Sequence, residues 1–117
     1  MKTKIFYVAA LAILLLSTTL VVYAQNASQT STIKTEAIKV SGNCETCKAR
    51  IEKAARIPGV SKADWNIKTK VLTLVYNPSK VKSEEVQKKI AAVGHDAGKF
   101  KADAKVYNAL PGCCKYR

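Results

Sequence analysis

Short runs of alternating apolar and polar residues divide this chain into a series of predicted strands. Alternation with a period of two is typical of a strand, because successive side chains point to opposite faces of the sheet. It predicts strands over residues 33–40, 60–67 and 71–76. A shorter and weaker run over residues 97–102 predicts a fourth strand.

Two further stretches carry apolar residues every three or four positions, the spacing of one helical face. The first covers residues 47–56, and Ile57-Pro58-Gly59 ends it. The second begins near Ser83, a favourable N-cap residue, and ends at Gly94. An N-cap aspartate also predicts a short third helix over residues 103–110.

The order of elements is strand, helix, strand, strand, helix, strand. It predicts an α+β fold, the ferredoxin-like βαββαβ sandwich, in which a four-stranded antiparallel sheet is covered by two helices. We expect the hydrophobic core between the sheet and the helices, with Leu72 and Leu74 facing inward. Trp65 is most simply a core residue.

The chain begins with a basic segment, Met1-Lys2-Thr3-Lys4, followed by an almost wholly apolar run over residues 5–22. Val22-Tyr23-Ala24 supplies small or modest side chains where a signal peptidase reads them. Residues 1–24 are therefore predicted to be a secretory signal peptide, which makes this an exported, periplasmic protein. The alternative is an uncleaved membrane anchor, since the apolar run is nearly long enough to span a bilayer.

Behind the signal peptide, the composition predicts three further parts. Residues 25–32 are polar and predict a flexible linker. Residues 33–102 carry the predicted sandwich, and residues 103–117 form a short helical tail that contains a Cys-Cys pair.

The balance of charges is strongly basic, with 20 Lys and Arg residues against 8 Asp and Glu residues and a net charge of +12. Loss of Lys2 and Lys4 with the signal peptide would lower the net charge to +10. We expect no nucleic-acid partner, because no basic run contains the interleaved aromatic residues of a stacking platform. Most of the lysines are explained as solvated residues, and the remainder favour docking onto an acidic partner or a membrane surface.

Four cysteines form two local pairs, Cys44/Cys47 and Cys113/Cys114, near opposite ends of the exported part. A disulfide within either pair would close only a tiny loop and add little stability. Close pairs suit metal binding or redox cycling better than cross-linking. The chemistry of the chain is therefore expected at these four sulfurs.

The first pair lies in the loop Ser41-Gly42-Asn43-Cys44-Glu45-Thr46-Cys47-Lys48, between the first predicted strand and the first predicted helix. Glycine at position 42 allows a sharp bend at the end of the strand. The positive end of the helix dipole favours the thiolate form of both cysteines, and Lys48 and Arg50 add positive charge. Thiolates bind soft metals and also exchange disulfides.

At this point the chain resembles the heavy-metal-associated domain family of copper chaperones, metal-ATPase N-terminal modules and periplasmic mercury-binding proteins. The resemblance covers roughly residues 33–102. It rests on the Cys44-Glu45-Thr46-Cys47 turn, Ile57-Pro58-Gly59-Val60, Tyr76-Asn77-Pro78 and Gly94-His95-Asp96-Ala97, together with the order of the elements. The resemblance implies that Cys44 and Cys47 are metal ligands.

The chain departs from the family pattern at two positions. The family usually has Gly-Met-x-Cys-x-x-Cys, whereas Gly42-Asn43-Cys44 lacks the Met and is one residue shorter. His95 stands where the family often has Tyr or Phe, in a loop that lies beside the metal site of this fold. His95 is either an additional ligand or proton-sensitive neighbour, or a surface residue in an aromatic position.

The number of ligands limits the choice of metal. Two thiolates suit Cu(I), or Hg(II) by resemblance to the mercury-binding members, whereas Zn(II) requires about four ligands. Further ligands would have to come from His95, Cys113 or Cys114. One hypothesis is that the helix over residues 103–110 carries the tail cysteines back across one sheet height, and the alternative is a free tail with its own thiol pair.

We therefore expect a metal-binding module and not an enzyme. It would capture a soft metal ion and pass it by thiolate exchange to a metal-transporting membrane protein, or to another metal-binding protein with an acidic docking surface. No small-molecule substrate is expected, and the protein is expected to be a monomer.

The alternatives are a periplasmic thiol–disulfide oxidoreductase that uses Cys44/Cys47, and a module whose cysteines are only closed by disulfides. The short chain and the lack of a Trp before Cys44 disfavour the oxidoreductase.

Overall fold

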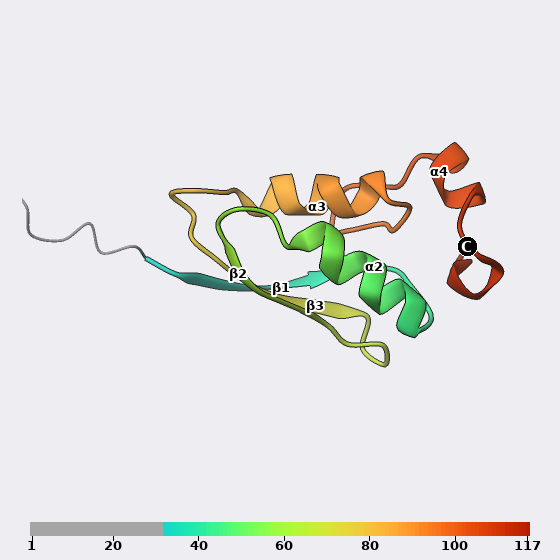
Figure 1. Ribbon diagram of the computed structural model, residues 1–117, viewed down its shortest axis with the longest axis horizontal. Helices are drawn as coiled ribbons and strands as arrows, with labels where there is room; N and C mark the ends of the chain where they lie inside the picture. Colours follow the sequence, from blue (N-terminus) through green and yellow to red (C-terminus); the bar gives the residue numbers. More distant parts are fainter. Residues whose placement is uncertain (1–31) are drawn as a thin grey trace, which may run out of the picture. The chain divides into compact units, whose positions relative to one another are not determined.

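The computed structural model describes residues 32–117 (Figure 1). The predicted signal peptide and almost all of the predicted linker lie outside the described residues. The elements are β1 (Lys34–Lys39), α2 (Glu45–Ala55), β2 (Val60–Trp65), β3 (Val71–Tyr76), α3 (Ser83–Ala92), α4 (Ala104–Asn108) and a 3₁₀ turn, η1 (Gly112–Cys114). Within these residues, no helix is both long enough and apolar enough to cross a membrane.

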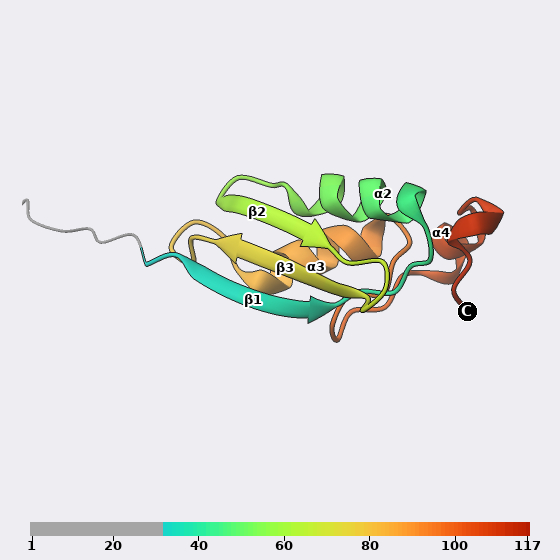
Figure 2. The same ribbon diagram turned by 90° about the horizontal axis from the view of Figure 1, so that it is seen from below.

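The three strands form one antiparallel sheet in the order β1-β3-β2. Ile38 of β1 and Trp65 of β2 both lie opposite Leu72 of the central strand, which places the three side chains in one row across the sheet. Helices α2 and α3 cover the same face of this sheet, as the two views show (Figures 1 and 2). This arrangement confirms the predicted ferredoxin-like class.

The core lies between that face and the two helices. Leu72, Leu74 and Trp65 are fully buried, as predicted. Each large apolar side chain removed from water contributes about 1.5–3 kcal/mol. The other members of the core contributed by the strands and helices include Ile38, Val40, Cys47, Ile51, Ala55, Ala63, Val86 and Ile90.

The predicted fourth strand over residues 97–102 is wrong. Ala97 makes one isolated bridge to Val40 and a second one to Phe100. Gly98 has a φ of +54°, a conformation that glycine adopts readily, and Ala97 and Phe100 exchange two backbone hydrogen bonds of 2.9 Å. The chain therefore turns back on itself through Gly98 and Lys99 instead of pairing along β1.

Because no fourth strand carries the chain along the sheet, the tail starts near the beginning of α2. In both views α4 lies at the end of the domain where β1 ends and α2 begins (Figures 1 and 2). The predicted third helix is present, and the Asp103 carboxylate caps it by accepting the Lys105 N–H at 2.8 Å. The tail reaches the cysteine loop without crossing the sheet.

Candidate metal centre

Cys44 and Cys47 lie at the start of α2. Cys44 is the N-cap residue, with an extended backbone, and Cys47 lies in the first turn of the helix. Their Sγ atoms are 3.3 Å apart. Cys44 is partly exposed, whereas Cys47 is buried, so one thiol of the pair faces solvent and the other packs in the core.

The loop before Cys44 approaches the core closely at Gly42. A Cβ atom at this position would lie 2.9 Å from Cη2 of Trp65 and 3.1 Å from Cβ of Cys47. Gly42 is not one of the described glycines with a positive φ. Glycine is therefore required there for space and not for a left-handed bend. Trp65 is itself fixed by its indole N–H, which donates to the Val40 carbonyl at 3.0 Å.

The position of Cys44 at the helix N-terminus lowers the pKa of its thiol from 9.0 to about 6. A hydrogen bond from the backbone of Cys47 is the main cause, followed by one from the Cys47 side chain. Partial burial opposes the shift, and weaker hydrogen bonds from Cys113 and Cys114 reinforce it. Cys44 is therefore a thiolate at neutral pH, the form that binds soft metals.

The two basic residues of this helix act differently from each other. The Nζ atom of Lys48 forms ion pairs of 2.8 Å with Glu52 and with Asp64, so the predicted contribution of Lys48 to the thiolates is wrong. Arg50 does meet the sulfurs, because its guanidinium donates to Sγ of Cys114 at 3.6 Å.

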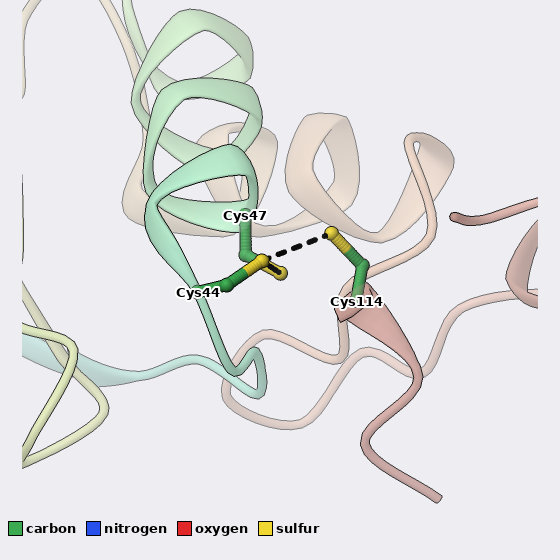
Figure 3. A group of neighbouring side chains, drawn as sticks. All are labelled: Cys44, Cys47 and Cys114. Atoms are coloured by element: carbon green, nitrogen blue, oxygen red, sulfur yellow. Dashed lines mark hydrogen bonds between the residues drawn. The ribbon is translucent and has the colours of Figure 1, made fainter. Parts of the chain in front are cut away.

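The tail brings a third sulfur to the pair. Sγ of Cys114 lies 3.6 Å from Sγ of Cys44, although 70 residues separate them, and the Cys114 side chain is fully buried. Figure 3 shows the three cysteines pointing toward one another, two from α2 and one from the tail. Cys113 is exposed and stays outside this group. The expectation of a free tail is wrong.

His95 is buried and is not a surface residue. Its Nδ1–H donates to the Ser41 carbonyl at 2.8 Å, and its Nε2 has no hydrogen-bond partner. The pKa of His95 is lowered, chiefly because burial disfavours the charged ring. The described cysteine group that can surround an ion does not include His95.

Several contacts fix the tail to the loop that contains His95. The hydroxyl of Tyr116 donates to the Gly94 carbonyl at 2.7 Å and accepts the Asp96 N–H at 2.9 Å. Arg117 forms an ion pair of 2.7 Å with Asp96. No local pattern in the sequence predicts that Tyr116 and Arg117 hold the tail against this loop.

A further contact fixes the tail to the cysteine loop itself. The side-chain amide of Asn43 donates to the Lys115 carbonyl at 2.6 Å. Asn43 lies in the shorter loop that lacks the family's Met, and His95, the second departure from the family pattern, stacks on Tyr116. The departures were the signal in the sequence that could have indicated the tail contact.

The sulfurs of Cys44, Cys47 and Cys114 all lie within 4.8 Å of one another. Three thiol groups at this separation match the ligand preferences of soft metal ions. The chemistry of this donor set therefore fits a soft metal and does not fit a hard cation such as Mg²⁺, which prefers oxygen ligands.

Comparison with known proteins agrees with this arrangement. The chain is 34% identical over 83 residues to a copper-exporting P-type ATPase of Bacillus subtilis; the match covers 69% of this chain and 10% of the ATPase. It is 39% identical over 61 residues to the copper chaperone CopZ of Staphylococcus epidermidis, covering 50% of this chain and 90% of CopZ. The chain thus spans about a tenth of the length of the ATPase it matches.

Among solved structures, oxidised MerP from Ralstonia metallidurans superposes with a TM-score of 0.54 and 25% identity, over 57% of this chain and 96% of MerP. The heavy-metal-associated domain family matches residues 37–96, which include the end of β1, the strands β2 and β3, helices α2 and α3, and the Cys44/Cys47 loop. This match covers about half of the chain, and the chain therefore belongs to the heavy-metal-associated domain family.

Proposed function

We propose that this protein binds a soft metal ion, Cu(I) or Hg(II), outside the cytoplasm and passes it to a partner by thiolate exchange. Cys44 and Cys47 bind the ion. The observation that carries the proposal is the pair of sulfurs 3.3 Å apart at the N-terminus of α2, one of them a thiolate near neutral pH. Copper is named in the descriptions of the Bacillus subtilis ATPase and of CopZ, which supports a soft ion, and zinc is named for a Synechocystis ATPase that is 37% identical over 70 residues.

Transfer requires that the incoming thiolate of a partner reach the ion. The partly exposed Cys44 provides that approach, and the fully buried Cys47 keeps the ion attached until exchange is complete. In each step a new metal–sulfur bond forms as an old one breaks, so the oxidation state of the metal does not change. No oxidant or reductant is needed.

The proposed partner is a metal-transporting membrane protein, or another metal-binding protein, with an acidic docking surface. A shallow hollow beside the cysteine loop is lined by Thr46, Ala49, Arg50, Lys53, Ala54 and Val93. Two of these residues are basic, so an acidic surface docked there would lie next to Cys44. The protein acts as a monomer in this proposal.

The direct test is titration of residues 25–117, fully reduced and free of oxygen, with Cu(I), Hg(II) and Zn(II). We expect tight uptake of one soft ion per chain, lost in the Cys44→Ser/Cys47→Ser variant and kept in the Cys113→Ser variant, whose cysteine is exposed. Uptake of Zn(II) alone would overturn the soft-metal assignment. No uptake, together with rapid reduction of insulin, would establish the oxidoreductase instead.

The location is tested separately by expression of the whole chain. We expect the exported protein to be recovered from the periplasm with Gln25 as its first residue. An uncleaved N-terminus in the membrane fraction would establish the anchored alternative.

A further inference from the structure

Resting on the metal binding proposed above, we propose that Cys114 is a third ligand, so that the C-terminal tail closes a trigonal site made of three sulfurs. In this arrangement the ion is bound by the two cysteines at the start of α2 and by one cysteine of a separate segment. Cys113, although it is the neighbouring residue, takes no part.

The distances between the sulfurs match a three-coordinate ion. With metal–sulfur bonds of about 2.3 Å, sulfurs lie about 4.0 Å apart around a trigonal ion and about 4.6 Å apart across a linear one. Cys44 lies 3.3 Å from Cys47 and 3.6 Å from Cys114, and no pair in the group exceeds 4.8 Å. Movements of less than about 1 Å, well within rotamer adjustment, would bring the three sulfurs around one ion.

The tail is built to present this sulfur. Tyr116 and Arg117 bind the loop at Gly94 and Asp96, on the far side of Cys114 from α4. Asn43, next to Cys44, binds the Lys115 carbonyl, next to Cys114. These contacts hold the three residues that follow Cys114, and they fix the position of its sulfur before any ion arrives, which reduces the entropy cost of binding.

Both departures from the family pattern support the same conclusion. Asn43 lies in the shorter loop that lacks the usual Met and bonds to the tail, and His95 replaces the usual aromatic residue and stacks on Tyr116. A cysteine loop that also contacts a tail needs different side chains from a loop that binds metal with two cysteines alone. The two substitutions are explained together if the tail belongs to the site.

Without an ion Cys114 is a neutral thiol, because burial and then the neighbouring sulfurs of Cys47 and Cys44 raise its pKa. A bound cation and the nearby positive charge must therefore stabilise a third thiolate. Three thiolates around Cu(I) carry a net charge of −2, which burial alone would make costly. The Arg50 guanidinium lies 3.6 Å from Sγ of Cys114, and the N-terminus of α2 faces the other two sulfurs. On binding, the Cys114 thiol releases its proton to solvent and its sulfur forms the metal bond, so charge and atoms balance.

The third ligand also gives a route for release. A partner thiolate would replace Cys114 first, and because Cys114 is fully buried this step requires the tail contacts of Tyr116 and Arg117 to open. Cys114 then takes up a proton from solvent, and the ion remains on Cys44 and Cys47 until the next exchange. Binding of metal and attachment of the tail are therefore coupled.

The first test is X-ray absorption spectroscopy of the Cu(I)-loaded protein. We expect three sulfur neighbours in the wild-type protein and in Cys113→Ser, and two in Cys114→Ser. The affinity of Cys114→Ser should fall by more than the roughly 10–100-fold that changes outside the ligand shell cost. Two sulfur neighbours in the wild-type protein, or an affinity of Cys114→Ser equal to that of the wild type, would overturn the third-ligand assignment. The Cys44→Ser/Cys47→Ser variant tests the proposed function independently of this result.

The second test measures the tail and not the metal. Trypsin cleaves after the exposed Lys101, which precedes the tail, and after the exposed Lys105, which lies in α4. Cu(I) should slow this cleavage at least about tenfold in the wild-type protein and in Cys113→Ser, because the ion cross-links the tail to α2. Equal metal protection in Cys114→Ser would contradict the proposal, whatever the cleavage rates without metal.

Discussion

The imidazole ring of His95 stacks on the phenol ring of Tyr116, with centroids 5.7 Å apart and an angle of 26° between the planes. Through this ring the loop after α3 contacts the tail, and the Nδ1–H of His95 contacts the loop before Cys44 at Ser41. One buried side chain thus joins the three segments that surround the cysteine group.

The pKa of His95 predicts a loss of stability in mild acid. Burial, and then the positive charge of Arg50, lower the pKa, while the Ser41 carbonyl and Asp96 raise it by less. Below pH 6.5, the value for an unperturbed histidine, the unfolded chain therefore binds more protons than the folded one. The contribution of neutral His95 to the free energy of unfolding should be fully present above pH 6.5 and should decrease as the pH falls below that value.

The control for this experiment is His95→Asn, which keeps a donor for the Ser41 carbonyl but cannot be protonated. His95 is the sole histidine of the chain, so the decrease between pH 6.5 and 5 should be smaller in the variant. Both proteins should carry Cys44→Ser, because Cys44 also titrates in this range. Parallel pH profiles from urea denaturation would contradict the assignment.

Cys44 should react with alkylating agents at lower pH than an ordinary cysteine. With a pKa of about 6, its iodoacetamide modification should reach half of its maximal rate near pH 6. The same residue in the denatured chain should do so near pH 8.5. Mass spectrometry of the peptide containing Cys44 and Cys47, with fragmentation to separate the two, measures both profiles; equal midpoints would refute the helix effect.

Gly42→Ala should destabilise the protein by about 1–3 kcal/mol, the usual cost of an extra carbon in a packed core. The added Cβ would lie 2.9 Å from the Trp65 ring. Denaturation followed by fluorescence of Trp65, the only tryptophan, measures the change. Gly112→Ala is the matched control, since its Cβ would meet nothing within 4 Å and should leave the midpoint unchanged.

Tyr116→Phe should loosen the tail while keeping the ring against His95. It leaves the Gly94 carbonyl and the Asp96 N–H without their partner, at a cost of about 1–3 kcal/mol for buried groups. Amide hydrogen exchange over residues 104–117 should accelerate, whereas exchange in the β3 core should not. Unchanged exchange in the tail would show that other contacts are sufficient to fix it.

Local patterns in the sequence predicted the three strands, the two large helices and the family resemblance. Alternation and helical spacing are local properties, and each fixes which face of an element is buried. The proximity of Cys44 and Cys47 could also be predicted from the sequence, because the two residues are three apart and their relative position depends only on one turn of helix. Leu72, Leu74 and Trp65 confirmed the predicted inward faces.

Some local sequence signals fit more than one structure, and only contacts with neighbouring residues in the fold decided between them. Gly98 fits a weak strand as well as a turn, and the turn was selected by the bridge between Ala97 and Phe100. Lys48 was expected to support the thiolates, but Glu52 one helical turn away and Asp64 on β2 bind it. The charge of a side chain can be read from sequence, whereas the direction in which it points depends on its partners.

The tertiary structure alone decided that the tail belongs beside the cysteine loop. Cys44 and Cys114 are 70 residues apart, and nothing in the spacing of either pair indicates which sulfurs meet. Their meeting depends on the Gly98 turn, the Asn43 contact and the anchors of Tyr116 and Arg117 acting together. Elements are set by local periodicity, but the third sulfur is placed by long-range contacts that exist only once the chain has folded.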